Sequence, residues 1–329
     1  MNKHHSHIII IGAGNVGSRH LQGLARIDRE IDISVIDPDQ ASLEVAKERF
    51  QEMPANILIK SISYYESIGL LENDVDVAII STNADIRRSV VEELLCQVRV
   101  RYIILEKVAF QSVKDFRMVI GLLKRKHVKA WVNIPWRMGS AFKKLQKEFA
   151  GERRIRIRVG GGAGGMTSNA IHHLELFVFL TGDTNLSIET SGLDKRTYDS
   201  KRSGFMEFGG TLVATTSRGD ELVFNDDKES VQPSIWKISS DNHCYTIKQS
   251  EGKVVSAHKE KGWVTKEEPF SIPYQSELTH IAIQQILDSG KCDLTTLNES
   301  FLLHKPMLES FIQHLSSITG DEHKKCSIT

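Results

Sequence analysis

The chain has 329 residues, and 42 Lys and Arg residues balance 42 Asp and Glu residues, so its formal net charge is zero. This balance argues against nucleic acid as a partner, because phosphate binding depends on a clustered excess of positive charge. Hydrophobic residues make up 40% and charged residues 26%, a mixture that is typical of a globular protein and not of a disordered or membrane-embedded chain. A chain of this length predicts about two domains.

The four cysteines lie far apart and form no C-x-x-C motif, so they indicate neither a disulfide framework nor a zinc ribbon. No apolar run approaches the ~18 residues of a membrane-spanning helix, and the apolar run at residues 8–11 is too short for a secretory signal. The scattered histidines also lack the spacing of metal ligands. We therefore expect a cytoplasmic protein with reduced thiols, no bound metal and no membrane partner.

Residues 1–135 alternate short β-branched runs with stretches of helical period. In the helical stretches, apolar residues such as Leu21, Leu24 and Ala25 share one helix face. Runs that are nearly all apolar fit strands that are buried on both faces of a parallel sheet. These runs are residues 7–11, 32–36, 56–60, 75–80, 101–105 and 129–134. The pattern predicts an α/β fold with a doubly wound parallel sheet in a dinucleotide-binding domain, residues 1–135.

The second half of the chain has a different pattern. Residues 205–224 and 234–264 alternate with period two and are interrupted by Gly, Asp and Ser, which predicts antiparallel hairpins. Helical period returns near the end, for example at Leu302, Leu303 and Met307. We expect a second domain, residues 136–329, of α+β type, with an open antiparallel sheet and helices on one side.

A glycine-rich motif directly follows the first predicted strand and opens a helix. Gly12, Gly14 and Gly17 form the pattern G-x-G-x-x-G, and Asn15 and Val16 lie within it. The first glycine permits a tight turn, the second lets the backbone approach a pyrophosphate, and the third lets helix and strand pack closely. The helix N-terminus then favours the anion. The motif in this context predicts a bound dinucleotide.

Asp37 lies 20 residues after Gly17, at the end of the second predicted strand. At this distance an acidic side chain accepts hydrogen bonds from the adenosine ribose hydroxyls and repels a 2′-phosphate. The segment Asp37-Pro38-Asp39 also fits a turn with a helix N-cap, and the two interpretations are compatible. We predict NAD as the cofactor in preference to NADP.

The sequence resembles the Gfo/Idh/MocA oxidoreductase family at several further motifs. The residues that carry the resemblance are Ser81, Thr82 and Asn83, then Glu106, Lys107 and Val108, then Asn133 and Arg137, and finally the segments 171–175 and 181–183. They are similar to the family's Ser-Thr-Pro turn, its Glu-Lys-Pro motif, its Asn…Arg pair, and its Ile-His-x-x-Asp helix with a Gly-Asp end. The resemblance covers most of the chain. It implies that residues 81–83, Glu106 and Lys107 belong to the cofactor site.

The resemblance also implies two catalytic residues, Lys107 and His172. The lysine ammonium can hydrogen-bond the oxygen whose proton moves during hydride transfer, with Glu106 beside it as a charge partner. A histidine suits a general base for an alcohol or a general acid for a ketone, and Glu175 can orient the ring from one helical turn away. The alternative interpretations are a surface lysine after a strand and a structural histidine at a helix start.

Two positions depart from the family pattern. Val108 replaces the proline of Glu-Lys-Pro, which changes the expected backbone geometry that fixes the lysine. Ser168 stands where many members carry an aspartate that pairs with the histidine. Arg137, Ser168 and His173 are the expected substrate contacts, and His173 is also the alternative to His172 for proton transfer.

The expected activity is NAD-dependent hydride transfer at a secondary alcohol or ketone of a carbohydrate-like or nucleotide-sugar substrate. A non-catalytic dinucleotide-sensing regulatory protein and a C=N reductase are alternatives, because the fold alone does not separate these functions. We also expect a homodimer or homotetramer assembled through the second domain, since an open sheet needs its free face or its edges covered.

Overall fold

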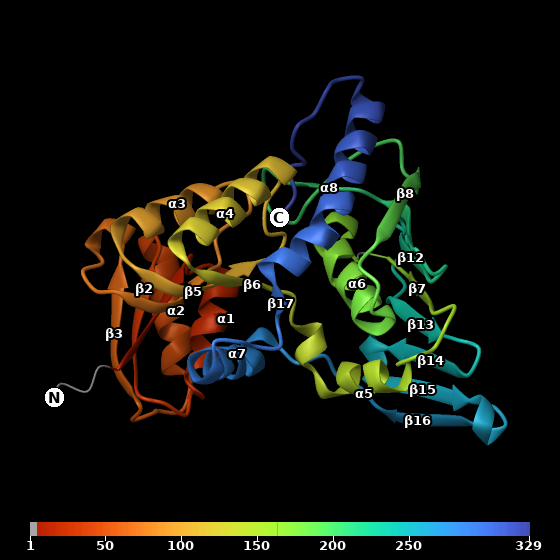
Figure 1. The fold of residues 1–329 in the computed structure, drawn as a ribbon, viewed down its shortest axis with the longest axis horizontal. Helices are drawn as coiled ribbons and strands as arrows, with labels where there is room; N and C mark the ends of the chain where they lie inside the picture. Colours follow the sequence, from red (N-terminus) through yellow and green to blue (C-terminus); the bar gives the residue numbers. More distant parts are fainter. Residues whose placement is uncertain (1–4, 163) are drawn as a thin grey trace. The chain divides into compact units, whose positions relative to one another are not determined.

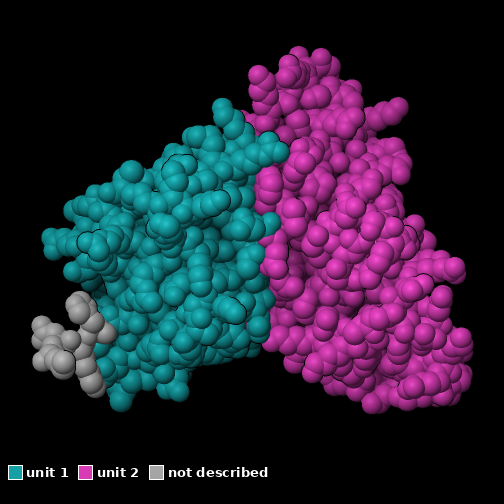
Figure 2. Space-filling model, in the orientation of Figure 1, with its two compact units in different colours: residues 1–110, 114–135, 273–298 teal, residues 111–113, 136–272, 299–329 magenta. Residues whose placement is uncertain are grey.

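The computed structural model describes residues 5–162 and 164–329. The chain divides into two compact units, which Figure 2 shows in different colours. Unit 1 comprises Met1–Phe110, Lys114–Pro135 and Pro273–Asn298, and unit 2 comprises Gln111–Val113, Trp136–Ile272 and Glu299–Thr329. Each unit therefore combines segments that lie far apart in the sequence.

Unit 1 is built on a seven-stranded sheet with the strand order β17-β6-β5-β4-β1-β2-β3 (Figure 1). The strands are β1 Ser6–Ile11, β2 Ile31–Ile36, β3 Ile59–Tyr65, β4 Val75–Ile80, β5 Val100–Glu106, β6 Lys129–Asn133 and β17 Thr295–Thr296. Strands β1 to β6 are parallel, and β17 pairs antiparallel with β6 at the edge. Ile8, Ile9 and Ile10 are fully buried, as expected for a central strand covered on both faces. The predicted doubly wound parallel sheet is confirmed.

The third strand begins later than the sequence pattern predicts. We expected it at residues 56–60, whereas β3 begins at Ile59 and continues to Tyr65. The reason is Asn56, whose side-chain amide donates to the carbonyl oxygens of Ala25 and Ile27 at 3.0 and 2.7 Å and fixes a turn before the strand. Because β3 is an edge strand with polar serines, it also lacks the continuous apolar run of the central strands.

Five helices flank this sheet, with α1, α2 and α7 on one face and α3 and α4 on the other (Figure 1). They are α1 Asn15–Leu24, α2 Gln40–Gln51, α3 Arg87–Gln97, α4 Val113–Lys126 and α7 Gln275–Ser289. Helices α1 and α7 pack closely, since a Cβ at Gly23 would lie 2.7 Å from the Cβ of Thr279. These contacts place the segment 273–298 in unit 1, whereas we expected it in the C-terminal domain.

Unit 2 is built on an eight-stranded sheet with the order β16-β15-β14-β13-β7-β12-β11-β8. The strands are β7 Arg156–Gly160, β8 Leu186–Leu193, β11 Gly210–Thr216, β12 Glu221–Asp226, β13 Ile235–Ser239, β14 His243–Lys248, β15 Lys253–His258 and β16 Thr265–Pro269, with β9 Tyr198–Asp199 and β10 Met206–Glu207 as a separate pair. All neighbours in the large sheet are antiparallel except β7 and β12. The predicted, mostly antiparallel second sheet is confirmed.

Among the described residues, three further α-helices complete the architecture: α5 Ser140–Glu148, α6 Met166–Thr181 and α8 Leu297–Thr319. Alternate residues of β7 show why α6 covers one face of the second sheet, because Ile157 is buried whereas Arg156 and Arg158 are exposed. Among the residues that the structure describes, no helix combines the length and the apolar character needed to cross a membrane.

Candidate functional site

The glycine-rich turn between β1 and α1 has the geometry that the motif predicts. Gly12 has φ +95°, a conformation that favours glycine. A Cβ on Gly17 would lie 1.7 Å from the carbonyl oxygen of Gly12, so only glycine permits this close approach of helix and strand. A Cβ on Gly14 would meet no atom within 4 Å, which leaves open space beside the backbone. The turn therefore offers an unobstructed backbone surface next to a helix start.

The first turn of α1 is suited to an anion. Gly14 is the N-cap, and within the described chain no side chain caps the helix and no acidic residue lies in its first turn. The backbone N–H groups at this end have no intrahelical acceptor, and the helix dipole favours negative charge there. Arg49 from α2 donates to Ser18 at 2.6 Å, which holds the two helices together beside this end.

Two side chains fix the glycine-rich turn from neighbouring strands. Asp37 accepts a hydrogen bond from the Ala13 N–H at 2.6 Å and another from the Asp39 N–H at 2.9 Å. Ser81, after β4, donates from its hydroxyl to the Gly12 carbonyl oxygen at 2.9 Å. Asp39 accepts from the N–H groups that begin α2, so it is the N-cap residue and Asp37 is not. The structure thus brings predicted cofactor residues from β2 and β4 to the same turn.

Glu106 ends β5 inside a polar network that the sequence analysis missed. Its Oε1 lies 2.9 Å from His20 Nε2, and it also accepts from the side-chain amide of Asn133. Thr279 and Gln275 on α7 extend the network to His20 and Asn133, respectively. Burial raises the pKa of Glu106, but the hydrogen bond and charge of His20 and the bond from Asn133 outweigh it, so the pKa is below its usual value. Glu106 is thereby held as a carboxylate.

Lys107 follows Glu106 directly and is half-buried. The peptide bond between Lys107 and Val108 is cis, and Val108 is fully buried. Because β5 ends at Glu106, Lys107 lies just past the carboxyl end of this strand, next to the end of β4. Ligands of doubly wound sheets bind outside these strand ends.

His172 lies on α6 in unit 2 and is 8% exposed. Its ring stacks on Trp136, with a centroid distance of 4.7 Å and an interplanar angle of 18°. The structure pairs Glu175, the expected orienting residue, with Arg137 at 3.0 Å, and the Arg137 guanidinium lies 4.8 Å from the centre of the Phe179 ring. Trp136, which the sequence analysis missed, is thus a direct neighbour of the predicted catalytic histidine.

His173 occupies an aromatic environment. Its ring centre lies 4.4 Å from that of Phe224 and 5.1 Å from those of Trp136 and Trp236. Burial lowers the pKa of His173 to about 3, because the apolar rings do not solvate a charged imidazole. Such a histidine is neutral near pH 7 and is a weak proton acceptor, so His173 is poorly suited to proton transfer near neutrality.

The start of α6 is held by two carboxylates. Asp226 accepts from the N–H groups of Gly164 and Met166, each at 2.9 Å, and Glu207 accepts from the Thr167 N–H at 2.7 Å. Negative side chains stabilise this helix end in place of an N-cap side chain. Ser168, which replaces the family's aspartate, donates to the Gly165 carbonyl oxygen at 3.2 Å. In sequence, the two carboxylates lie too far from α6 to be identified as its caps.

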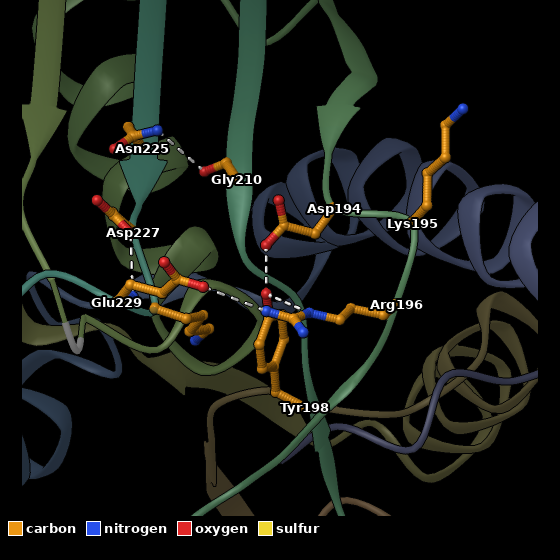
Figure 3. Close-up of a pocket in the computed structure, with 9 residues that line it drawn as sticks. Asp194, Lys195, Arg196, Tyr198, Gly210, Asn225, Asp227 and Glu229 are labelled. Carbon is orange, nitrogen blue, oxygen red and sulfur yellow. Dashed lines mark hydrogen bonds and ion pairs between the residues drawn. The ribbon is translucent and has the colours of Figure 1, made fainter.

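A polar cavity of about 500 Å³ lies in unit 2 beside β8, β9, β11 and β12 (Figure 3). Tyr198 donates to Asp194 at 2.6 Å, and the Nε of Arg196 donates to the Tyr198 hydroxyl at 2.9 Å. Lys228 pairs with the buried Asp226 at 2.6 Å. Because these side chains satisfy one another, the cavity does not by itself indicate a ligand. It contains none of the residues that the sequence predicts for the site.

Comparison with known proteins finds a family match for the N-terminal domain. The model for the Gfo/Idh/MocA oxidoreductase family, with its NAD-binding Rossmann fold, matches residues 6–134. Residues 6–134 are thus similar to the NAD-binding Rossmann domain of the Gfo/Idh/MocA oxidoreductase family. The match indicates that these residues form an NAD(P)-binding domain. No curated protein matches the sequence.

Solved structures share the fold of this protein over nearly the whole chain. An oxidoreductase from Agrobacterium radiobacter in complex with NAD+, L-tartaric acid and magnesium has a TM-score of 0.72 and 15% identity, covering 97% of this chain and 98% of the other. UDP-N-acetylglucosamine 3-dehydrogenase from Acidithiobacillus ferrooxidans has a TM-score of 0.67 and 15% identity, with coverages of 97% and 98%. A 3-ketoreductase from Actinomadura kijaniata in complex with NADP has a TM-score of 0.69 and 12% identity, with coverages of 93% and 96%. At these identities the likeness establishes the fold.

The residues of unit 1 fit the dinucleotide of this family. The α1 N-terminus is uncapped, and the space beside Gly14 is open. The Thr82 hydroxyl oxygen is buried and has no hydrogen-bond partner among the described residues, so a polar ligand group at this turn would satisfy it. Gly12 to Gly17 would hold the pyrophosphate, and Asp37 would hold the ribose of the adenosine half. The bound dinucleotide would supply the hydride acceptor or donor.

Proposed function

We propose that this oxidoreductase uses NAD to oxidise a secondary alcohol, or NADH to reduce the ketone, of a carbohydrate-like or nucleotide-sugar substrate. The observation that carries the proposal is the arrangement at one edge of the unit 1 sheet. There, the adjacent strands β2, β1, β4 and β5 are followed by Asp37, the glycine turn, Thr82 and Lys107, respectively. This edge of the sheet combines the proposed cofactor-binding turn with the Lys107 ammonium group, which is suited to hydrogen-bond a substrate oxygen.

The preference for NAD over NADP rests on Asp37. Its carboxylate lies at the end of β2 and is held by the Ala13 N–H. The remaining acceptor capacity of the two oxygens suits the ribose hydroxyls, and the negative charge repels a 2′-phosphate. No arginine occurs in the segment 37–40 to neutralise that phosphate.

The choice of a hydroxyl or keto group as the reacting centre is supported by two fold relatives. The names of the Acidithiobacillus 3-dehydrogenase and of the Actinomadura 3-ketoreductase both describe this interconversion, and the former acts on a nucleotide sugar. Small-molecule substrates of this kind also agree with the zero formal charge of the chain, which provides no excess of positive charge for a polyanion.

We assign the chemical roles as follows. Lys107 donates a hydrogen bond to the substrate oxygen and stabilises the negative charge that develops on this oxygen as its proton is removed, before hydride transfer to the nicotinamide leaves a neutral carbonyl. His172 accepts the hydroxyl proton during oxidation and returns it during reduction. Arg137, Ser168 and His173 are proposed substrate contacts, and the Glu175 carboxylate fixes the guanidinium of Arg137.

The direct test is a substrate panel. Purified protein is incubated with NAD+ and individual sugars, cyclitols or nucleotide sugars, and NADH formation is followed at the nicotinamide absorbance. In parallel, NADH is offered with ketones and with cyclic imines. Oxidation of an alcohol in the panel supports the proposal, whereas turnover confined to imines identifies a C=N reductase. Tight NADH binding without turnover of any member favours the dinucleotide sensor.

A further inference from the structure

A buried arginine joins two turns of the dinucleotide domain. Arg87 is the first residue of α3 and is 1% exposed. Its Nη1 donates to the carbonyl oxygen of Val108 and, at 2.9 Å, to that of Ala109. Its Nη2 donates to the carbonyl oxygen of Thr82. One guanidinium group therefore connects the turn after β4 to the turn after β5.

Helix stability alone does not explain an arginine at this position. The N-terminus of a helix carries partial positive charge, so a cation in the first turn is unfavourable, and Asp, Glu or Ser is preferred there. Burial of a cation is also unfavourable unless polar partners replace water. The carbonyl oxygens of Thr82, Val108 and Ala109 provide that replacement. The planar guanidinium can serve several acceptors at once, whereas the ammonium of lysine is a compact point charge.

Both turns belong to the dinucleotide site. Thr82 follows Ser81, whose hydroxyl donates to Gly12, and a Cβ on Gly12 would lie 2.8 Å from the Thr82 backbone nitrogen. Val108 follows Lys107. Burial raises the pKa of Glu106, whereas the contacts of Glu106 with His20 and Asn133 and, after them, the positive charge of Arg87 lower it. Arg87 thus acts on the carboxyl ends of two adjacent strands.

We propose that Arg87 is a positioning residue that fixes the Thr82 turn and the Lys107 turn as one rigid platform for the dinucleotide. The platform keeps the backbone beside the glycine turn in its binding geometry before the ligand arrives, which lowers the entropy cost of binding. This proposal rests on the cofactor site of the family and, for the placement of Lys107, on the proposed function.

The neighbouring residue provides a matched control. Arg88 lies on the same helix and pairs with Glu92 at 2.8 Å and with Asp115 at 2.9 Å. Its side chain is 30% exposed, and its partners lie on α3 and α4 rather than in the two turns. Arg88→Met therefore removes a guanidinium and its hydrogen bonds from the same helix without touching the platform.

The experiment measures NADH dissociation constants by fluorescence titration for the wild type, Arg87→Met, Arg87→Lys and Arg88→Met. All titrations are run at a temperature at which circular dichroism shows folded protein. We expect Arg87→Met to weaken NADH binding by about tenfold or more, Arg87→Lys to weaken it less, and Arg88→Met to stay within about twofold. Binding needs no substrate, so an inactive substrate panel would leave this test unaffected.

Chemical rescue separates positioning from a general loss of stability. Millimolar guanidinium chloride should restore NADH affinity to Arg87→Ala, because the free ion can occupy the space of the lost group, whereas sodium chloride at equal ionic strength should not. In the folded Arg87→Lys protein, amides of residues 81–83 and 107–110 should exchange faster than in the wild type, with the amides of β1 unchanged.

Three outcomes would overturn the proposal. The first is NADH affinity within twofold of wild type in Arg87→Met and Arg87→Lys. The second is an equal loss of affinity in Arg88→Met. The third is failure of Arg87→Met, Arg87→Lys and Arg87→Ala to fold, which would make this residue a determinant of the whole domain rather than of the platform.

Discussion

The carboxylate of Asp37 accepts a hydrogen bond from the backbone N–H of Ala13 at 2.6 Å. The residue that we propose for ribose recognition therefore also fixes the glycine-rich turn that would hold the pyrophosphate. Since its other oxygen accepts from the Asp39 N–H, the side chain is already oriented by backbone donors before a ligand binds. This orientation reduces the entropy that recognition of the dinucleotide costs.

NADH should bind more tightly than NADPH, by about tenfold or more, because the Asp37 charge repels a 2′-phosphate. Asp37→Ala should narrow this ratio and also weaken NADH binding, since the turn loses its acceptor. Fluorescence titration with both dinucleotides measures the ratio. Asp39→Ala is the control: loss of the α2 N-cap should lower the free energy of unfolding and leave the ratio of the two dissociation constants unchanged. Tighter binding of NADPH by the wild type would refute the assignment.

Replacement of Lys107 by Met should lower kcat more than it lowers NADH affinity. The ammonium is expected to interact most strongly with the oxygen when negative charge develops in the transition state. Steady-state kinetics on a substrate identified in the panel, combined with NADH titration, separate the two effects. If kcat and NADH affinity fall by the same factor, Lys107 is a cofactor contact and not a catalytic residue.

His172→Ala should lower turnover by ~10²–10⁴ if this histidine transfers the proton. It should also flatten the limb of the pH–rate profile near neutrality. His173→Gln should retain that limb, because burial lowers the pKa of His173 to about 3 and it does not titrate near neutrality. A His172→Ala protein with an unchanged pH–rate profile would remove this residue from the mechanism.

The free energy of unfolding should decrease as the pH falls from about 6.5 towards 3. The pKa of His173 is lowered to about 3 in the folded protein, against a usual value near 6.5. Between these values the unfolded chain binds more protons than the folded protein, so acid favours unfolding, by up to about 1.4 kcal/mol per pH unit for one group. In urea unfolding, the free energy of unfolding of His173→Gln should decrease less between about pH 6.5 and 5 than that of the wild type. Parallel curves for the two proteins would contradict the burial effect.

We propose that the protein forms a homodimer or homotetramer through the exposed face of the unit 2 sheet. Val213 and Val223 are directly paired on this face and half-buried, with Arg158 on the next strand. Sedimentation at micromolar concentration should give a mass about two or four times the 37.0 kDa of one chain. Val223→Glu should shift the equilibrium towards the monomer, whereas Val45→Glu, on α2 of unit 1, should not. A wild-type monomer would contradict the proposal.

The sequence by itself determined the dinucleotide domain and its glycine turn. These features have local causes: the positive φ of Gly12 and the missing Cβ of Gly17 are requirements within six residues, and the buried parallel strands show as apolar runs. The alternation that predicts the second sheet is local as well, since Ile157 faces the interior while Arg156 and Arg158 face solvent.

Only the tertiary structure decided which polar groups meet. Glu106 pairs with His20, 86 residues away, and Asn133 donates to Gln275, 142 residues away, which ties α7 to the first unit. Nothing in the sequence distinguishes Arg87 from other helix residues. In the structure it is buried and donates hydrogen bonds to the turns at Thr82 and Val108. Hydrogen bonds between distant segments depend on how strands and helices pack, and neither residue type nor spacing along one segment encodes that packing. For this reason the sequence identified the cofactor motif but not the network that supports it.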